Sequence, residues 1–594
     1  MQTWKSLPPL KILGIFCLQH AGQKSLRSVS RVSKQVIPMK IALAQMNSTV
    51  GDIKGNQTKI FEGITKARKE GASIVAFPEM AITGYPPHDL LYENAFLKAN
   101  KEAILDIAPE SMGLIVIVGF IDYDANKNLY NSAAIFEDGK LLRIVHKTLL
   151  PTYDVFDEER YFEPGSLDDV IPTNITVENN TYSLGVEICE DLWDADYETK
   201  VTDILCKNGA NLIINISASP FHVGKVFERH DLAIEKSKRN SAPLFLVNLV
   251  GGQDELIFDG QSFAVDSKGE IIALGAAFEE DLIIAELDTE SWEGKKISMP
   301  TYDKSKEMYD ALTLGIRDYF RKTGFEKAVL GLSGGIDSSL TACIAVDALG
   351  PENVIGVSMP SKFSSDHSKS DAEKLANNLD IKYLEVAIQD IVDAFHQSVE
   401  SSLRELRKHY NVDISHDDHV ANENIQPRVR GNILMDYSNR LKDLKILVLN
   451  TGNKTELALG YCTLYGDMTG GVGVIGDVSK LEVYQLAKYV NRREGREVVP
   501  QGSITKKPSA ELKEDQFDPF DFDIVSPMVD EIVEKRRGKR ELIELGYPEK
   551  AVNDVYRRVR LAEYKRWQAP PCIRITKKSF GIGWKMPIVN HYRD

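Results

Sequence analysis

The sequence predicts an α/β protein with two parts of different architecture. Over residues 39–287, short apolar strands alternate with helical stretches, which indicates sheets buried under helices. After about residue 306 a regular strand–helix–strand alternation begins, which is typical of an open parallel sheet with helices on both faces. A chain of 594 residues is also too long for one hydrophobic core, so we expect at least two domains.

The first part is predicted from short apolar runs bounded by turn residues. We expect strands at Ile41–Gln45, Ser73–Phe77, Leu114–Phe120, Ser132–Phe136, Leu141–Val145, Ser183–Ile188, Leu212–Ile216 and Leu244–Asn248. A helical stretch, Asn56–Glu70, separates the first two strands. The part ends in a strand–turn–strand with Lys268 and Gly269 at the turn.

The second part follows a polar, irregular stretch from Asp288 to Lys306, where we place the boundary. A helix over Lys306–Arg321 leads into the parallel sheet. Its predicted strands are Ala328–Leu332, Val354–Met359, Lys382–Val386 and Ile446–Asn450, and its helices include Asp337–Leu349 and Asp366–Leu379. Ligands of such sheets bind at the carboxyl ends of the strands.

Composition and charge restrict the classes of partner. The formal charge of -15 argues against nucleic acid or anionic lipid as a general partner, although a local basic pocket for a nucleotide remains open. No apolar run is long enough to span a bilayer. The six cysteines are scattered without a CxxC pair, which disfavours disulfides and zinc and favours a reducing compartment, the cytoplasm.

The first 38 residues differ from the rest of the chain. They hold six Lys or Arg and no acid, which is typical of a transit-type leader. The alternative is an over-extended start, because MKIALAQMN from Met39 opens like a buried first strand. Both readings exclude residues 1–38 from the predicted fold.

A serine- and glycine-rich loop follows the first strand of the second part. The string SGGIDSS, Ser333–Ser339, lets the backbone turn tightly and brings N–H groups close to an anion, and the helix that follows adds its positive end. Asp337 would be badly placed beside a phosphate unless a cation lies between them, so it is a candidate Mg²⁺ ligand. The Lys of a Walker loop is absent, and the alternative is an ordinary serine-capped turn.

A second glycine pattern looks like a dinucleotide fingerprint. Residues 471–476 read GVGVIG and match GxGxxG, but they follow a polar Tyr-Gly-Asp segment where the fingerprint needs a strand. We therefore expect a glycine-rich loop and disfavour a Rossmann dehydrogenase.

Three residues of the first part stand at predicted strand ends. Glu79, Lys147 and Cys189 each follow a strand, so distant parts of the chain can bring them together. Amide hydrolysis by a thiol needs a base to take the thiol proton and a donor for the developing oxyanion, which a carboxylate and an ammonium supply. We also expect the ammonium to lower the thiol pKa. Each residue alone is more often a buried thiol, a cap or a surface charge.

Resemblance to known families narrows these readings. The SGGIDSS string resembles the ATP pyrophosphatase family, whose members activate a carbonyl or acyl oxygen as an adenylate. Further matches to the NAD synthetases extend over nearly all of 300–594: Glu423–Gln426, Arg428–Gly431, Ser438–Asn439, Thr451–Glu456, Tyr465–Met468, Lys507–Leu512 and Glu563–Pro571. The resemblance implies an open parallel-sheet, Rossmann-like domain over about 326–594.

The same resemblance implies ligand roles at matching positions. ATP would be held by Gly331, Leu332, Ser333, Gly334, Gly335, Ile336, Asp337, Ser338 and Thr451. Deamido-NAD would be bound by Asn424, Glu456 and Lys565, Mg²⁺ by Asp337 and Glu456, and Lys480 would lie near the activated carboxylate. Pro427 and the length of Leu441–Lys445 depart from the family pattern, and we expect both beside Asn424.

The first part is similar to the nitrilase superfamily over about 39–290, which implies an αββα sandwich and a catalytic Glu79–Lys147–Cys189 set. The segment Asp157–Gly165 matches the one that carries the superfamily's second glutamate, which we assign to Glu158. Tyr153, Ser219 and Lys225 match positions that bind glutamine in the glutaminase branch, although Ser219 and Lys225 also fit an ordinary loop.

Both halves in this order resemble the glutamine-dependent NAD synthetases, with a linker and helix over 291–325. That family implies glutamine, ATP and deamido-NAD as substrates, a protected ammonia passage and a homo-oligomer. Two alternatives stay open. The first is another pyrophosphatase-type enzyme, such as a tRNA-modifying or GMP-type amidating synthetase. The second is a non-catalytic binding protein, or a bare amidase with a degenerate partner domain.

Overall fold

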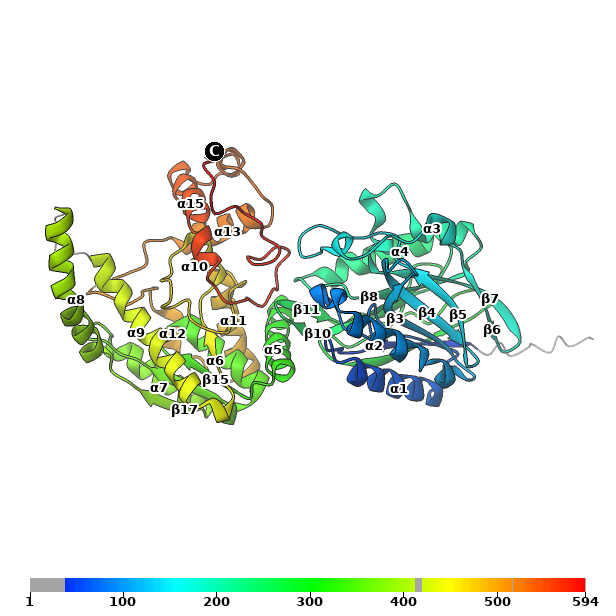
Figure 1. Ribbon diagram of the computed structural model, residues 1–594, viewed down its shortest axis with the longest axis horizontal. Coiled ribbons are helices and arrows are strands. Elements are labelled where there is room, and N and C mark those ends of the chain that lie inside the picture. Colours follow the sequence, from blue (N-terminus) through cyan, green and yellow to red (C-terminus); the bar gives the residue numbers. More distant parts are fainter. Residues whose placement is uncertain (1–37, 412–418, 515, 593–594) are drawn as a thin grey trace, which may run out of the picture. The chain divides into compact units, whose positions relative to one another are not determined.

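The first half of the chain is a four-layer sandwich of two mixed sheets between helices. The computed structural model describes residues 38–411, 419–514 and 516–592 (Figure 1), so the predicted leader or over-extended start, residues 1–38, lies outside it except for Pro38. The first sheet has the order β14-β1-β2-β3-β4-β5, with bounds Asp281–Leu287, Met39–Gln45, Ile74–Ala76, Ile115–Tyr123, Leu129–Glu137 and Lys140–His146. The second has the order β13-β12-β9-β8-β7-β6, with bounds Ile271–Leu274, Phe263–Val265, Leu244–Asn248, Leu212–Ser217, Asn180–Ile188 and Thr173–Val177.

The layers are held by three apolar cores. Inward residues such as Leu43 and Ile214 pack between the two sheets. Helices α1 (Ile53–Lys69) and α2 (Asn94–Leu105) cover the outer face of the first sheet. Helices α3 (Val201–Lys207) and α4 (Lys225–Asn240) cover the outer face of the second. The predicted αββα sandwich is confirmed.

The second half is built on a five-stranded parallel sheet. Its order is β17-β16-β15-β18-β19, with bounds Lys382–Glu385, Val354–Ser358, Lys327–Gly331, Ile446–Asn450 and Val472–Gly473. One face packs on α6 (Ile336–Leu349), α7 (Asp366–Leu379) and α11 (Lys480–Glu494), and the other on α8 (Gln389–Tyr410) and α9 (His419–Arg440). The predicted open parallel sheet with helices on both faces is confirmed.

The remaining helices lie downstream of the sheet. They are α10 (Lys454–Leu459), α12 (Gln501–Thr505), α13 (Phe522–Val533), α14 (Lys539–Glu544), α15 (Glu549–Leu561) and α16 (Glu563–Arg566). Helices α10, α13 and α15 share a small core of their own. None of the helices formed by the described residues combines the length and the apolar character needed to cross a membrane.

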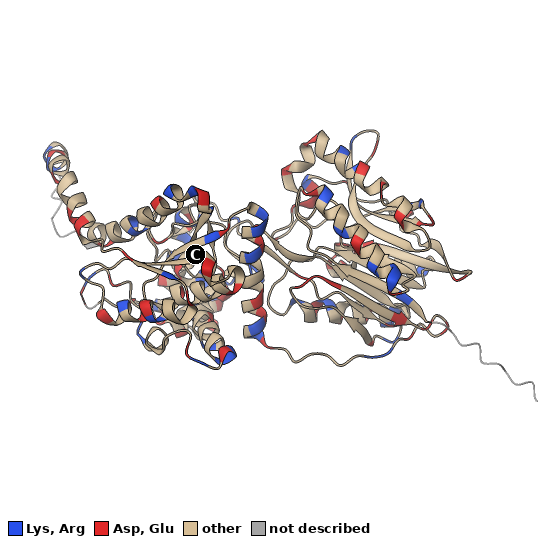
Figure 2. Ribbon diagram, turned by 90° about the horizontal axis from the view of Figure 1, so that it is seen from below, with Lys and Arg blue, Asp and Glu red and all other residues tan. Residues whose placement is uncertain are grey.

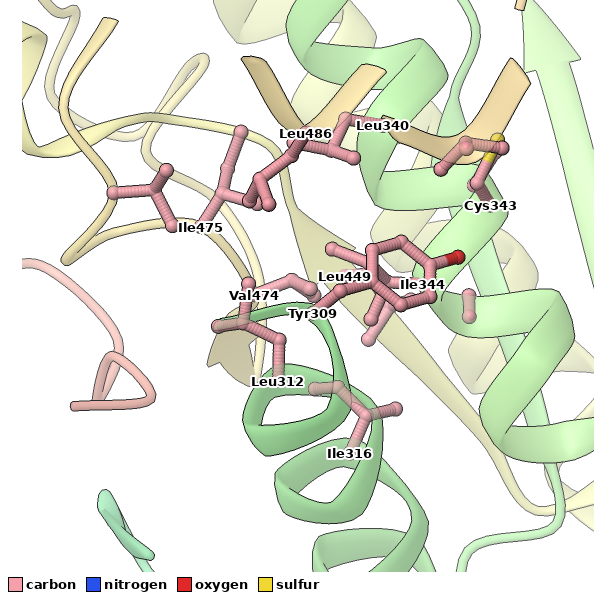
Figure 3. Packing of buried hydrophobic residues seen from close by; sticks show 14 of the residues in the cluster. Tyr309, Leu312, Ile316, Leu340, Cys343, Ile344, Leu449, Val474, Ile475 and Leu486 are labelled. Atoms are coloured by element: carbon pink, nitrogen blue, oxygen red, sulfur yellow. The ribbon is translucent and has the colours of Figure 1, made fainter. Parts of the chain in front are cut away.

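Helix α5 (Lys304–Thr323) packs against both halves. Figure 3 shows its Tyr309, Leu312 and Ile316 beside residues of α6 in the core of the second half. On the first half, α5 contacts the hairpin β10 (Val250–Gln253) and β11 (Leu256–Asp259). There the buried Asp318 accepts from Asn47 Nδ2 at 2.6 Å and from the backbone N–H of Gly252 at 2.8 Å. The division at 291–325 stays a prediction, because the described residues from Pro38 onward form one compact unit.

Charged residues of both signs are interspersed along the helices (Figure 2). Several form pairs one turn apart, such as Arg440 with Asp436 at 2.7 Å and Arg404 with Glu400 at 2.8 Å. Such exposed pairs contribute little to stability, because water and salt screen their charges. Fold stability therefore rests mainly on the apolar cores.

Candidate active sites

The ends of three strands bring the predicted trio together. Glu79 lies in the turn after β2, Lys147 follows β5 directly, and Cys189 follows β7 directly. Lys147 Nζ donates to Glu79 Oε1 at 2.8 Å and to both carboxylate oxygens of Glu158 at 2.9 Å. All four side chains are buried. Taking charges out of water is costly, so a buried ammonium held by two carboxylates indicates a functional site.

Two residues that the sequence reasoning missed fix the carboxylates. Asn131 Nδ2 donates to Glu79 Oε1 at 2.6 Å, and the Tyr85 hydroxyl donates to Glu158 Oε1 at 3.0 Å. The backbone N–H of Ala218 donates to the other Glu79 oxygen at 2.8 Å. An asparagine inside the apolar run of β4 was the available signal, because a buried amide needs a polar partner.

Electrostatics at Cys189 differ in part from the expectation. Burial and then the negative charge of Glu79 raise the pKa of the Cys189 thiol well above its ordinary value, and Lys147 opposes them. Burial disfavours the charged Lys147, but Glu158 and Glu79 outweigh it and hold the pKa of Lys147 well above its ordinary value. The resting thiol is therefore protonated beside a charged lysine, and its proton must pass to a base when it reacts.

The Cys189 backbone is also unusual. Its φ is 45°, in the left-handed region, at the first residue of the short helix η5 (Cys189–Leu192). A non-glycine residue in that region stores strain of about 1 kcal/mol or more. The structure therefore holds Cys189 in place against its own backbone preference.

The three predicted glutamine-binding residues lie around the same centre. The Tyr153 hydroxyl donates to Glu190 Oε1 at 3.0 Å, one residue after the cysteine. Lys225 Nζ lies 3.6 Å from the centre of the Trp193 ring. Ser219 is buried and directly follows Ala218, which binds Glu79.

Glu190 is a further residue that the sequence reasoning left without a role. It accepts hydrogen bonds from Tyr153 and from the Tyr197 hydroxyl, the latter at 3.0 Å. Burial raises the pKa of Glu190 to about 6. A further carboxylate, besides Glu79 and Glu158, thus lies beside the cysteine.

In the second half, a cavity of about 320 Å³ lies at the carboxyl ends of β15, β16 and β18. Eight of the nine predicted ATP-binding residues border it: Gly331, Leu332, Ser333, Gly335, Ile336, Asp337, Ser338 and Thr451. Gly334 turns away, with a φ of 74°, and a Cβ there would lie 2.1 Å from the Ser368 carbonyl oxygen. The loop therefore needs glycine at that position for both conformation and space.

Two carboxylates and an ammonium meet at the border of this cavity. Lys480 Nζ lies 2.5 Å from Asp337 Oδ2 and 3.5 Å from Glu456 Oε1, and Asn453 Nδ2 donates to Asp337 Oδ1 at 2.9 Å. Burial raises the pKa of Glu456, with Lys480 opposing and Asp337 reinforcing the shift. In the part of the chain that the structure describes, no group of three or more His, Cys, Asp or Glu is placed to hold a metal ion.

Asn424 and Lys565 lie behind this border and contact one segment. The Thr463 hydroxyl donates to Asn424 Oδ1 at 2.9 Å, and Lys565 Nζ donates to the carbonyls of Gly460 and Cys462 at 2.8 and 2.7 Å. Cys462 itself borders the cavity, whereas Asn424 and Lys565 do not. Their predicted role toward deamido-NAD stays a prediction.

One expectation about this region is wrong. Pro427 lies in α9 near Asn424, as expected, and it also borders the cavity. Leu441–Lys445 instead follows the last residue of α9, Arg440, at the opposite end of the helix. At 1.5 Å rise per residue that end is about 25 Å from Asn424, so the longer segment does not affect the geometry there.

Besides Lys480, four cations border the cavity for which the sequence predicted no role. They are Lys369, Arg430, Lys506 and Lys507. Arg430 Nε donates to the Met359 carbonyl at 2.9 Å, and burial lowers the pKa of Arg430 to about 10. A cavity bordered by several cations suits the phosphates of a nucleotide.

The GxGxxG segment lies apart from the cavity, and its residues do not border it. Val472 and Gly473 form the edge strand β19, where the sequence predicted only a loop. A Cβ at Gly473 or Gly476 would lie 2.6 or 2.2 Å from Cys572 Sγ. These glycines therefore leave room for the C-terminal segment around Cys572. This close packing accounts for the GxGxxG pattern without a bound dinucleotide.

That C-terminal segment returns to the first half. Both Arg574 and Lys578 contact the Asp154 carboxylate, Lys578 Nζ at 3.1 Å from Oδ1. Asp154 has a left-handed φ of 54° and directly follows Tyr153. The loop that carries Tyr153 is thus held by two cations from the other end of the chain.

Comparison with known proteins agrees with this geometry. A family model described as carbon-nitrogen hydrolase matches residues 40–296, and one described as NAD synthase matches residues 308–569. A relative from Synechocystis sp., named glutamine-dependent NAD(+) synthetase, is 41% identical over 573 residues, covering 93% of this chain and 99% of its own. One of the same name from Thermotoga maritima is 38% identical, covering 94% and 99%.

Two solved structures described as glutamine-dependent NAD(+) synthetases are also similar to this chain. The glutamine-dependent NAD(+) synthetase of Acinetobacter baumannii, in complex with adenosine diphosphate, aligns with a TM-score of 0.73 at 36% identity over 93% of this chain and 99% of its own. The one from Cytophaga hutchinsonii has a TM-score of 0.78 at 22% identity, over 93% and 98%, which shows the shared fold.

Proposed function

The chain belongs to the family of glutamine-dependent NAD(+) synthetases, and from that premise we propose how its residues divide the work. The first half releases ammonia from glutamine. The second half uses ATP to activate deamido-NAD and joins the ammonia to it, giving NAD. The observation that carries this proposal is the presence, in one chain, of the Glu79–Lys147–Glu158 cluster beside Cys189 and of the cavity bordered by Asp337, Glu456 and Lys480.

In the first half, Cys189 acts as the nucleophile. Its sulfur attacks the side-chain amide carbon of glutamine while Glu79 takes the thiol proton, and the Lys147 ammonium stabilises the oxyanion. The C–N bond breaks as Glu79 returns the proton to the leaving ammonia, which leaves a γ-glutamyl thioester. Water, deprotonated by Glu79, then releases glutamate and restores the thiol. Glu158 keeps Lys147 charged and in position.

Glutamine itself would be held by residues around this centre. Tyr153, Ser219 and Lys225 lie on three different segments that contact Glu190, Glu79 or Trp193. A cation such as Lys225 suits the α-carboxylate of an amino acid.

In the second half, the nicotinate carboxylate of deamido-NAD attacks the α-phosphorus of ATP and displaces pyrophosphate. Ammonia then attacks the resulting acyl adenylate, AMP leaves, and the amide of NAD remains. The loop Gly331–Ser338, with Thr451, borders the cavity at a helix N-terminus, where phosphates bind well. The structure of the relative from Acinetobacter baumannii is a complex with adenosine diphosphate, which supports nucleotide binding by this chain.

The donor chemistry of the cavity fits Mg²⁺. Asp337 and Glu456 offer carboxylate oxygens on either side of the Lys480 ammonium, so this border already binds a positive charge. Mg²⁺ is typically held by one or two carboxylates together with substrate phosphates. Asp337 and Glu456 would hold it, and the ion would neutralise charge on the phosphates of ATP. Lys480 would stay beside the activated carboxylate.

We further propose small molecules as the substrates, a cytoplasmic location and a homo-oligomer. Scattered cysteines without a CxxC pair support a reducing compartment. Resemblance to the family supports the homo-oligomer, and light scattering on the purified chain tests it.

One experiment tests the whole proposal. The purified chain receives Mg·ATP, deamido-NAD and glutamine labelled with ¹⁵N in its side-chain amide. We expect NAD, AMP and pyrophosphate in equal amounts, glutamate in at least that amount, and the label in the NAD amide. Replacing deamido-NAD by XMP should give no amidated product. Absence of label from NAD, in the presence of turnover, would overturn the proposed ammonia supply.

A further inference from the structure

A fourth carboxylate of this site, Asp191, joins the two segments that carry Lys147 and Cys189. Its Oδ1 accepts from the backbone N–H groups of Thr148 and Leu149 at 3.0 and 2.8 Å. Its Oδ2 accepts from the backbone N–H of Ile188 at 3.0 Å. The side chain is 1% exposed. One buried carboxylate therefore binds the backbone just after the lysine and just before the cysteine.

This connection crosses between the two sheets of the sandwich. Lys147 follows β5 of the first sheet, and Cys189 follows β7 of the second. Between the sheets the packing is apolar, and apolar packing gives attraction without direction. A carboxylate that accepts three backbone hydrogen bonds does have direction, and it fixes both strand ends relative to one another.

The same carboxylate supports the strained backbone of Cys189. The bond from Ile188 to Asp191 closes a turn around Cys189, whose φ is 45°. A residue in the left-handed region relaxes unless its surroundings hold it there. The N–H groups of Thr148 and Leu149 also lie past the end of β5, where a buried donor needs another acceptor.

We propose that Asp191 is a positioning residue for glutamine hydrolysis: it sets the placement of the Lys147 ammonium relative to the Cys189 thiol. It acts through the backbone of both residues. The inference rests on the proposed function, since it concerns the rate of that half-reaction. A displacement of about 1 Å at a reacting centre costs about a hundredfold in rate.

The chain contains a matched control in Asp266. Its Oδ1 accepts from the backbone N–H groups of Lys268 and Glu270 at 3.0 and 2.9 Å, and its Oδ2 accepts from that of Gly294 at 3.3 Å. It is 2% exposed, in the same half, at the turn between β12 and β13. Asp191→Asn and Asp266→Asn thus make the same chemical change, and only the first lies at the strand ends of the site.

The experiment compares these two variants with the unsubstituted full chain. It measures kcat and KM for glutamine-driven synthesis, ammonium-driven synthesis, the pH profile of Cys189 alkylation by iodoacetamide, and the thermal midpoint. For Asp191→Asn we expect kcat with glutamine to fall at least tenfold with KM within twofold. The midpoint of the alkylation profile should move to higher pH, because the thiolate loses its placed cation, while ammonium-driven synthesis is retained.

Asp266→Asn should lower the thermal midpoint comparably and leave kcat and the alkylation profile unchanged. Equal effects of both variants on kcat and alkylation would overturn the inference. If Asp191→Asn does not fold, Asp191→Glu replaces it, since it keeps the acceptors but displaces them by one methylene. An unchanged kcat in Asp191→Glu would also overturn the inference. If the unsubstituted chain releases no ammonia from glutamine, the proposed function fails instead.

Discussion

The Lys147 ammonium lies 2.8 Å from Glu79 Oε1, and both side chains are fully buried. A second carboxylate, Glu158, approaches the same ammonium at 2.9 Å. One cation thus faces two anions, and the cluster carries spare negative charge beside a protonated thiol. A proton acceptor therefore lies close to the thiol, which the proposed hydrolysis requires.

Removal of the proposed nucleophile should leave the second half active. We expect Cys189→Ala to abolish NAD synthesis from glutamine and to retain most of the synthesis from ammonium chloride. Cys206→Ala, a half-buried cysteine on α3, is the control and should retain both activities. If Cys189→Ala loses both activities equally, the division of labour between the halves is wrong.

Removal of the buried Lys147 ammonium should also lower the stability of the fold. Lys147→Met leaves Glu79 and Glu158 buried without a cation, so we expect the free energy of unfolding at pH 7 to fall by about 3–5 kcal/mol. The loss should shrink at pH 5, because burial and Glu79 raise the pKa of Glu158, and without Lys147 to oppose them Glu158 takes up a proton and relieves the unpaired charge. Urea unfolding at both pH values measures this. The double variant Glu79→Gln with Lys147→Met should lose less, and a loss independent of pH would argue against the ion cluster.

A substitution of Lys480 should impair the second half and spare the first, which is the reverse of the effect expected for Cys189→Ala. Lys480→Met should remove both glutamine-driven and ammonium-driven synthesis by a hundredfold or more, because two carboxylates of the cavity lose their cation. Basal release of glutamate from glutamine should remain. Lys488→Met, on the exposed face of the same helix α11, serves as the control. Unchanged ammonium-driven synthesis in Lys480→Met would exclude Lys480 from the reaction.

The glycine pattern can be tested by rescue. In Gly473→Ala the new Cβ would lie 2.6 Å from Cys572 Sγ, so we expect a large drop in the thermal midpoint. Adding Cys572→Ala removes that sulfur and leaves the next atoms at 3.5 Å, an ordinary contact, so stability and activity should return. A glycine needed for close approach to a dinucleotide would not be rescued in this way.

A buried acid outside the reacting cluster predicts how stability varies with pH. Burial, with a contribution from Asp191, raises the pKa of Glu187 from 4.5 to about 8. The folded chain then keeps a proton that the unfolded chain releases, so the free energy of unfolding falls as pH rises between these values, by up to about 1.4 kcal/mol per pH unit.

Glu187→Gln removes this titration. The variant should match the unsubstituted chain at pH 5 and exceed its stability at pH 8, as measured by urea unfolding across that range. Glu178→Gln, exposed in the turn between β6 and β7, changes the charge equally and should show no such difference. Parallel curves for Glu187→Gln and the unsubstituted chain would contradict the buried titration.

Strands and helices with strong apolar patterns were predictable from the sequence. The observed β9, β18 and α7 coincide with their predicted bounds. The hairpin β10–β11 and the strand β14 were missed. Strand β14 closes the first sheet by pairing with β1, more than 230 residues earlier, and such distant pairing leaves no local signal.

The site was predictable to a similar degree. Glu79, Lys147, Cys189 and Glu158 were found because three follow apolar strands and all four match a known pattern. Their supports Asn131, Tyr85 and Asp191 were missed, since each acts through a hydrogen bond to a residue distant in sequence or to a backbone group. The net upward shift of the Cys189 pKa was missed as well, because burial depends on packing that no motif encodes.

The contact of Arg574 and Lys578 with Asp154 has a consequence for anyone who divides this protein. A fragment that stops near residue 290 would keep the nucleophile but lose both cations that hold the Tyr153 loop. A truncation before Cys572 would do the same from the other end and would also uncover β19. We therefore expect the two halves to lose activity as separate pieces, because Arg574 and Lys578 hold the loop that carries Tyr153, a residue proposed to bind glutamine.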